Sequence, residues 1–124
     1  LGTSCDVGAS WALPRLVGLR HALEIALLGD TLTASDALRL GLVNRVVPAE
    51  HLGEATATLV NRLANGPTLA YGATKRLMRA SFDHNLDAQL AAETAAFANC
   101  AATRDMRVGI EAFFAKQPAQ FEGR

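Results

Sequence analysis

The spacing of apolar residues along the chain predicts helices over most of its length. Leucine and alanine recur every three or four positions in the second half, which is the period of one helix face. The clearest runs cover residues 51–65, 67–82 and 86–101. Thr103 can cap one more helix, which carries Phe113 on its apolar face.

The first third of the chain predicts three shorter helices. One begins near Ser10, with Pro14 close enough to its first turn for the missing N–H to cost little. A second covers residues 20–28, and because it is apolar almost all round we expect it to be well buried. A third begins at Thr33, where Thr33 and Asp36 have the spacing of a capping box with Asp in place of Glu.

One segment reads as a strand instead. Residues 42–47 are rich in β-branched side chains and are stopped by Pro48. The pattern as a whole predicts a mainly α chain of about seven helices with one short strand.

Composition narrows the class of protein. The chain has 124 residues, half of them apolar, and a formal net charge of zero. This length suits one domain. The high apolar fraction argues against a disordered chain, and the zero net charge argues against a nucleic-acid surface. No apolar run is long enough to cross a bilayer and the first residues lack the order of a signal peptide. We therefore expect a cytoplasmic protein without membrane or nucleic-acid partners.

Cysteine and histidine give no sign of a metal site. Cys5 and Cys100 lie far apart, which favours two reduced thiols over a single disulfide. The three histidines are scattered singly, without the spacing of zinc ligands. We expect no bound metal.

Asp6 is the residue whose position suggests chemistry. It lies just before Gly8 and the first predicted helix, where free N–H groups and the helix dipole favour a carboxylate. An acid/base group fits that place, although capping and turn formation are the more ordinary uses of Asp there.

Several short motifs, taken in order, resemble the enoyl-CoA hydratase/isomerase (crotonase) superfamily. The resemblance covers essentially the whole chain, and only the ordered set is specific. Its motifs are Leu1-Gly2, Asp6-Val-Gly8, Leu13-Pro-Arg-Leu-Val-Gly18, Ala22-Leu-Glu-Ile-Ala-Leu-Leu-Gly-Asp30, Ala34-Ser-Asp-Ala37, Gly41-Leu-Val-Asn-Arg-Val-Val-Pro48, Gly66-Pro67, Thr74-Lys75 and Gly109-Ile-Glu-Ala-Phe-Phe-Ala-Lys116 with Phe121.

The resemblance implies the C-terminal portion of an α/β crotonase (ClpP/crotonase-like) fold. Residues 1–66 would end the crotonase core, and residues 67–124 would form a C-terminal helical trimerisation region. The chain, which opens in mid-motif, would be a C-terminal fragment. The family's oxyanion-hole N–H groups and two usual catalytic glutamates would lie upstream of Leu1, so we expect this fragment alone to be inactive. Trimers, or dimers of trimers, are the implied assembly.

The resemblance also assigns roles near the start of the chain. Gly2 and the turn from Asp6 to Gly8 would line the acyl end of the site. Many hydratases carry Gly at the position of Asp6. Dienoyl-CoA isomerases carry Asp, which moves a proton along the acyl chain, but so do many bacterial members named hydratases.

Three further residues match the family's coenzyme A contacts. Phe97 would line the CoA pocket, and Phe113 and Lys116 would be presented to the CoA nucleotide by a neighbouring subunit. The simpler alternative makes both phenylalanines core residues and Lys116 a helix C-terminal charge favoured by the dipole.

The function implied is hydration of a 2-enoyl-CoA thioester through an enolate. CoA would enter as part of the substrate, with no metal or redox cofactor. One alternative is a dienoyl-CoA or enoyl-CoA isomerase that uses Asp6. Another is a non-catalytic helical oligomerisation module.

Overall fold

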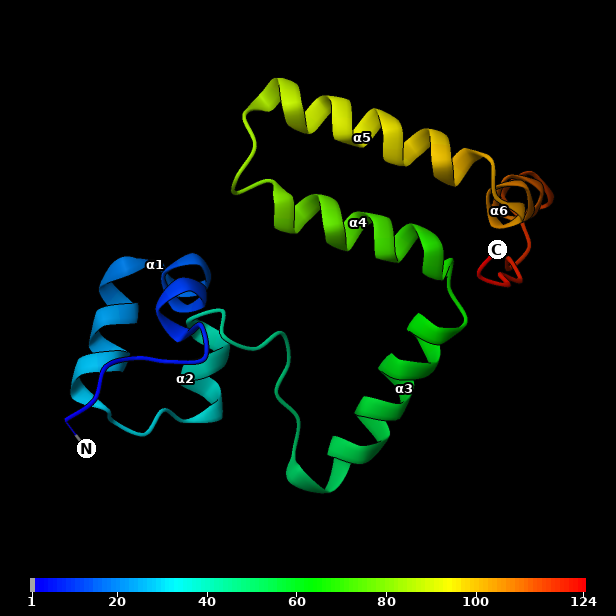
Figure 1. Ribbon diagram of the computed structural model, residues 1–124. Helices are drawn as coiled ribbons and strands as arrows, with labels where there is room; N and C mark the ends of the chain where they lie inside the picture. Colours follow the sequence, from blue (N-terminus) through cyan, green and yellow to red (C-terminus); the bar gives the residue numbers. More distant parts are fainter. Residues whose placement is uncertain (1) are drawn as a thin grey trace. The chain divides into compact units, whose positions relative to one another are not determined.

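The computed structural model describes residues 2–124, and the chain divides into two compact units between Leu52 and Gly53 (Figure 1). Most of the described residues are helical, as the apolar spacing predicts. In order they are α1 (Ala9–Leu28), α2 (Ala34–Arg39), the 3-10 helix η1 (Ala49–His51), α3 (Leu52–Ala64), α4 (Thr68–Ala80), α5 (Leu86–Ala101) and α6 (Arg104–Ala115). The functional division predicted between residues 66 and 67 is a different kind of boundary and stays a prediction.

Gly18 breaks α1 into two helical parts that run in different directions (Figure 1). Its backbone has φ 76° and ψ 159°, a region that essentially only glycine occupies. The two separate helices predicted around this position are therefore present as the two parts of α1. Counted this way, the described α-helices agree with the expected number of about seven.

Pro14 lies deeper in α1 than predicted. The helix begins at Ala9, directly after Gly8 in a left-handed conformation, so Pro14 is the sixth residue and lies past the first turn. At that depth proline removes a hydrogen bond that the helix would otherwise make. The expectation that Pro14 costs little is therefore wrong.

Thr33 caps α2 as predicted. Its hydroxyl oxygen accepts a hydrogen bond from the Asp36 N–H at 3.1 Å and its O–H donates to the Asp36 carboxylate at 2.6 Å. Arg39 adds an ion pair to the same carboxylate at 3.0 Å. The six residues of α2 are thus held by contacts within its own sequence.

The predicted strand at residues 42–47 is wrong. Within residues 2–124 no segment is a strand, and residues 42–47 form an irregular connection that leads to η1. β-Branched composition shows only that a segment suits a pleated surface, and a strand needs a partner to take up its backbone hydrogen bonds.

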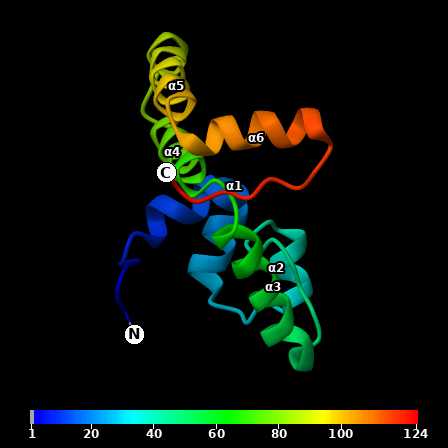
Figure 2. The same cartoon turned by 90° about the vertical axis from the view of Figure 1, so that its right-hand side faces the viewer.

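The second unit is built on α4, α5 and α6. α4 packs against α5, and α5 packs against α6. α6 crosses α5 near the C-terminal end of α5 (Figures 1 and 2). Asn85 caps α5 and Thr103 caps α6, each accepting from a backbone N–H three residues on. After Lys116 the chain turns back and residues 117–124, here called the tail, run back along α6 (Figure 2).

The apolar stripes are less buried than their spacing suggests. Ala22 is the buried residue of the helix predicted over 20–28, whereas Leu27 and Leu28 are exposed, which corrects the expectation of a well-buried helix. On α5, Leu86, Leu90 and Phe97 share the predicted face but are all exposed. Periodicity identifies the residues on one face without showing whether anything covers it. Among the described helices, none is both long and apolar enough to cross a membrane.

Candidate functional site

Asp6 lies in a tight turn at the start of α1. Val7 and Gly8 both have positive φ, 51° and 84°, and the N–H of Ala9 donates to the backbone carbonyl of Asp6 at 2.9 Å. Positive φ is rare for a β-branched residue such as Val7 and marks a strained turn. The turn leaves the Asp6 side chain exposed, along with Gly2 and Gly8.

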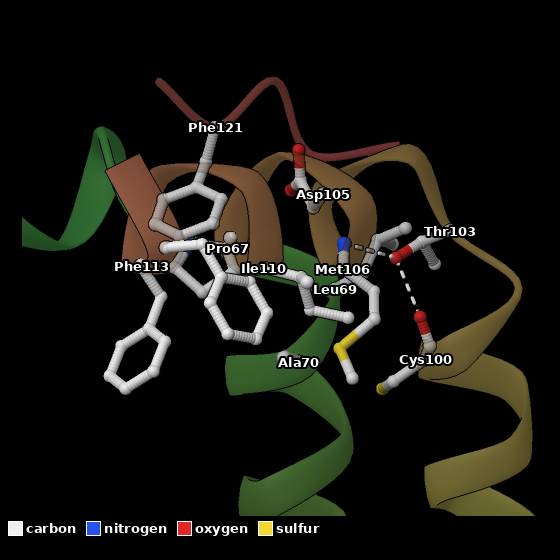
Figure 3. Close-up of a pocket in the computed structure, with 12 residues that line it drawn as sticks. Pro67, Leu69, Ala70, Cys100, Thr103, Asp105, Met106, Ile110, Phe113 and Phe121 are labelled. Atoms are coloured by element: carbon white, nitrogen blue, oxygen red, sulfur yellow. Dashed lines mark hydrogen bonds between the residues drawn. The ribbon is translucent and has the colours of Figure 1, made fainter. Parts of the chain in front are cut away.

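The second unit contains an apolar hollow of about 490 Å³ (Figure 3). It lies where the start of α4, the end of α5, α6 and the tail meet. Side chains that line it include Leu69, Met106, Ile110, Phe113 and Phe121. Surfaces of this kind bind or cover apolar groups.

Phe113 lines this hollow, whereas Phe97 lines a neighbouring one between α4 and α5. Ala70 and Cys100 border both hollows. Phe97 is 66% exposed and Phe113 is 78% exposed, so the simpler interpretation of both as core residues of this chain is wrong. Their exposure is compatible with contact to a ligand or another subunit.

Lys116 ends α6 in a left-handed conformation with φ 54°. Its N–H donates to the Phe113 carbonyl at 3.2 Å, so one turn of chain joins the two residues predicted to contact the CoA nucleotide. The Lys116 side chain is exposed. The predicted site residues therefore fall into two groups, Gly2, Asp6 and Gly8 in the first unit and Phe97, Phe113 and Lys116 in the second.

The sequence patterns do not single out Asp105, a buried carboxylate beside the hollow. Phe121 of the tail, which enters from the sequence only as the last residue of the family motifs, also lines the hollow. The partners of Asp105 are backbone groups 17 and 18 residues further on. Helical periodicity carries no signal for a contact between a helix and a loop.

Among residues 2–124, no group of three or more His, Cys, Asp or Glu residues is arranged to hold an ion. Cys5 and Cys100 are both free thiols, Cys5 exposed and Cys100 half-buried.

Comparison with known proteins gives a consistent result. The family model for enoyl-CoA hydratase/isomerase matches residues 1–124. A probable enoyl-CoA hydratase of Rhodobacter capsulatus is 37% identical over all of this chain and 48% of its own length. The 1,2-epoxyphenylacetyl-CoA isomerase of Escherichia coli is 36% identical, over all of this chain and 47% of its own length.

Solved structures agree with this match. The crystal structure of an enoyl-CoA hydratase/isomerase from Cupriavidus metallidurans superposes with a TM-score of 0.91 at 34% identity, covering 98% of this chain and 46% of that one. The chain thus spans about half the length of the relatives it matches and corresponds to their C-terminal part, as predicted. The chain therefore belongs to the enoyl-CoA hydratase/isomerase family.

Proposed function

We propose that the whole protein hydrates a 2-enoyl-CoA thioester. The observation that carries this proposal is the family match over residues 1–124. Water would add across the C2–C3 double bond, with the hydroxyl on C3 and a proton delivered to C2 of an enolate. CoA enters as part of the substrate, and the proposed reaction uses no metal or redox cofactor.

This chain would supply the acyl end of the site and contacts to CoA. Gly2, Asp6 and Gly8 would border the acyl group. The exposed aromatic rings of Phe97 and Phe113 suit contact with CoA, and Lys116 offers a compact positive charge for a phosphate. The enolate-stabilising N–H groups and the catalytic glutamates are proposed to lie in the other half of the family's fold.

The test compares the intact protein with these 124 residues expressed alone, using crotonyl-CoA. We expect the intact protein to turn over and the isolated chain to show no measurable hydration, because loss of even one oxyanion donor typically costs about 10²–10³ in rate. Turnover by the isolated chain at the rate of the intact protein would contradict this division of roles. An intact protein that assembles but acts on no acyl-CoA would instead support the non-catalytic oligomerisation module.

An isomerase is the second candidate, and Asp6 is the observation that favours it. Its carboxylate is exposed on a strained turn, so it is free to face a substrate. Isomerisation must remove a proton at one carbon and return it at another, which suits an additional acid. One relative, from E. coli, is named as an isomerase of an acyl-CoA.

Asp6→Asn in the intact protein separates the two reactions when it is assayed on a 2-enoyl-CoA and a 3,5-dienoyl-CoA. A loss of about 10²-fold or more on the dienoyl substrate alone fits general acid–base catalysis and favours the isomerase. Equal loss on both substrates places Asp6 in a hydratase site, and no loss on either leaves it a turn residue. Asp30→Asn, another exposed carboxylate of the first unit, is the matched control.

A further inference from the structure

Asp105 binds the tail through both its side-chain carboxylate and its backbone N–H. It is 3% exposed and is the buried polar residue of the described chain. Its Oδ1 accepts from the Glu122 N–H at 2.7 Å and its Oδ2 accepts from the Gly123 N–H at 2.9 Å. Its own N–H donates to the backbone carbonyl of Arg124 at 3.0 Å.

These three bonds join the start of α6 to the end of the tail. Asp105 is the second residue of α6, where a helix leaves N–H groups without a partner inside the helix, and the Arg124 carbonyl satisfies one of them. Hydrogen bonds to a carboxylate are about twice as strong as those between neutral groups. Residues 117–124 form no helix or strand, and these bonds fix the last three residues of the tail to α6.

The tail in turn brings Phe121 to the hollow (Figure 3). The ring lies directly against α6, because a Cβ built on Gly109 would meet Phe121 Cε1 at 3.4 Å. Further along, a Cβ on Gly123 would come within 2.7 Å of Thr68 Oγ1, so the tail also touches the first residue of α4. The tail therefore bridges α4 and α6, two of the three helices that border the hollow.

The other polar contacts of the tail are weaker candidates for holding it. Glu122 pairs with Arg104 at 3.2 Å and with Arg124, but all three side chains are at least one-third exposed. Ion pairs exposed to water contribute little to stability. Asp105 is the buried partner, and leaving a buried carboxylate unpaired is costly.

We propose that the tail is a latched strap over the hollow. The Asp105 carboxylate is the latch, and Phe121 is the plug that occupies one side of the hollow. Opening the latch frees Glu122 and Gly123, withdraws the half-buried Phe121 ring from the hollow and uncovers the face of α6 at Gly109 that the ring contacts.

Hydrogen–deuterium exchange of the tail in the intact protein tests the latch. In the unaltered protein we expect the Glu122 and Gly123 amides to be protected, and Asp105→Ala to speed their exchange by about tenfold or more, because both acceptors are lost. Asp105→Asn should act in the same direction, since its NH₂ would face a backbone N–H. Glu122→Gln is the matched control and should leave the exchange unchanged.

The plug is tested with the dye ANS, which binds exposed apolar surface. Asp105→Ala should raise ANS fluorescence, and Phe121→Ala should raise it while the Glu122 and Gly123 amides stay protected. Unprotected tail amides in the unaltered protein would overturn the proposal. So would equal acceleration by Glu122→Gln, or an Asp105 variant that keeps its tail protected. If Asp105→Ala fails to fold, Asp105→Asn and Phe121→Ala decide the outcome.

Discussion

At the scale of single residues, Lys116 is where the family assignment makes the sharpest prediction. Its side chain is exposed and its backbone ends α6 in a left-handed turn. In the intact protein we expect Lys116→Ala to raise the KM for acyl-CoA several-fold and leave kcat nearly unchanged, because a contact to a remote phosphate stabilises ground and transition states equally. Steady-state kinetics at varied acyl-CoA concentration measure both constants.

Arg107→Ala is the control for this experiment, because it removes another exposed positive charge from the same helix. It should leave the KM unchanged. If Lys116→Ala does the same, Lys116 is a surface charge and the proposed nucleotide contact is wrong.

Asp36 gives a prediction about pH. The Thr33 hydroxyl, followed by Arg39, holds the pKa of the Asp36 carboxyl below its ordinary value of 3.8. A carboxyl whose pKa is lower in the folded state contributes stability above its unfolded pKa and loses that contribution as pH falls through the folded pKa. We expect Thr33→Val to raise the pKa of Asp36 toward 3.8, measured by NMR titration of its side-chain carbon. An unmoved pKa would show that Thr33 is not its main stabiliser.

At the scale of elements, the features that the sequence predicted correctly are those that depend on residues close together in the chain. The bounds of α5, the caps at Thr33 and Thr103 and the break between the two parts of α1 all depend on residues a few positions apart. The strand expected at residues 42–47 failed because pairing depends on a distant partner. The contact between Asp105 and the tail could not be predicted from the sequence for the same reason. Its carboxylate accepts hydrogen bonds from backbone N–H groups 17 and 18 residues further along the chain.

The break in α1 leads to a prediction about stability. Gly18 has φ 76° and ψ 159°, so an added Cβ is strained although nothing lies near enough to clash with it. We expect Gly18→Ala to lower the free energy of unfolding by about 1–3 kcal/mol, the usual cost of such a conformation. Denaturant unfolding measures it.

Gly53→Ala is the matched control. Gly53 lies in α3, has no positive φ and has open space where its Cβ would point. Alanine there should be neutral or raise stability by up to about 1 kcal/mol. An equal loss of unfolding free energy in both variants would mean that the positive φ of Gly18 is not what makes alanine destabilising there.

At the scale of the whole molecule, the sequence identified the family but could not show how its surfaces are covered. The ordered motifs from Leu1-Gly2 to Phe121 were enough to assign the family. The same sequence gave Phe97 and Phe113 two opposite interpretations, core or ligand contact, and only the structure showed them exposed. Burial depends on every element that packs nearby, so a stripe of apolar residues cannot decide it alone.

Exposed apolar surface leads to the last prediction, that the intact protein is a homo-oligomer; the expected number of three or six copies comes from the family resemblance. In this chain, large apolar side chains remain exposed on several helices, with Leu86 71% and Met78 68% exposed. Surface of this extent usually marks an interface. Light scattering coupled to size-exclusion chromatography should give a mass of three or six subunits at micromolar concentration. High salt should not dissociate the assembly, because apolar contacts, unlike exposed ion pairs, are not screened. A stable monomer under these conditions would contradict the prediction, and dissociation by salt would show that charges hold the subunits together.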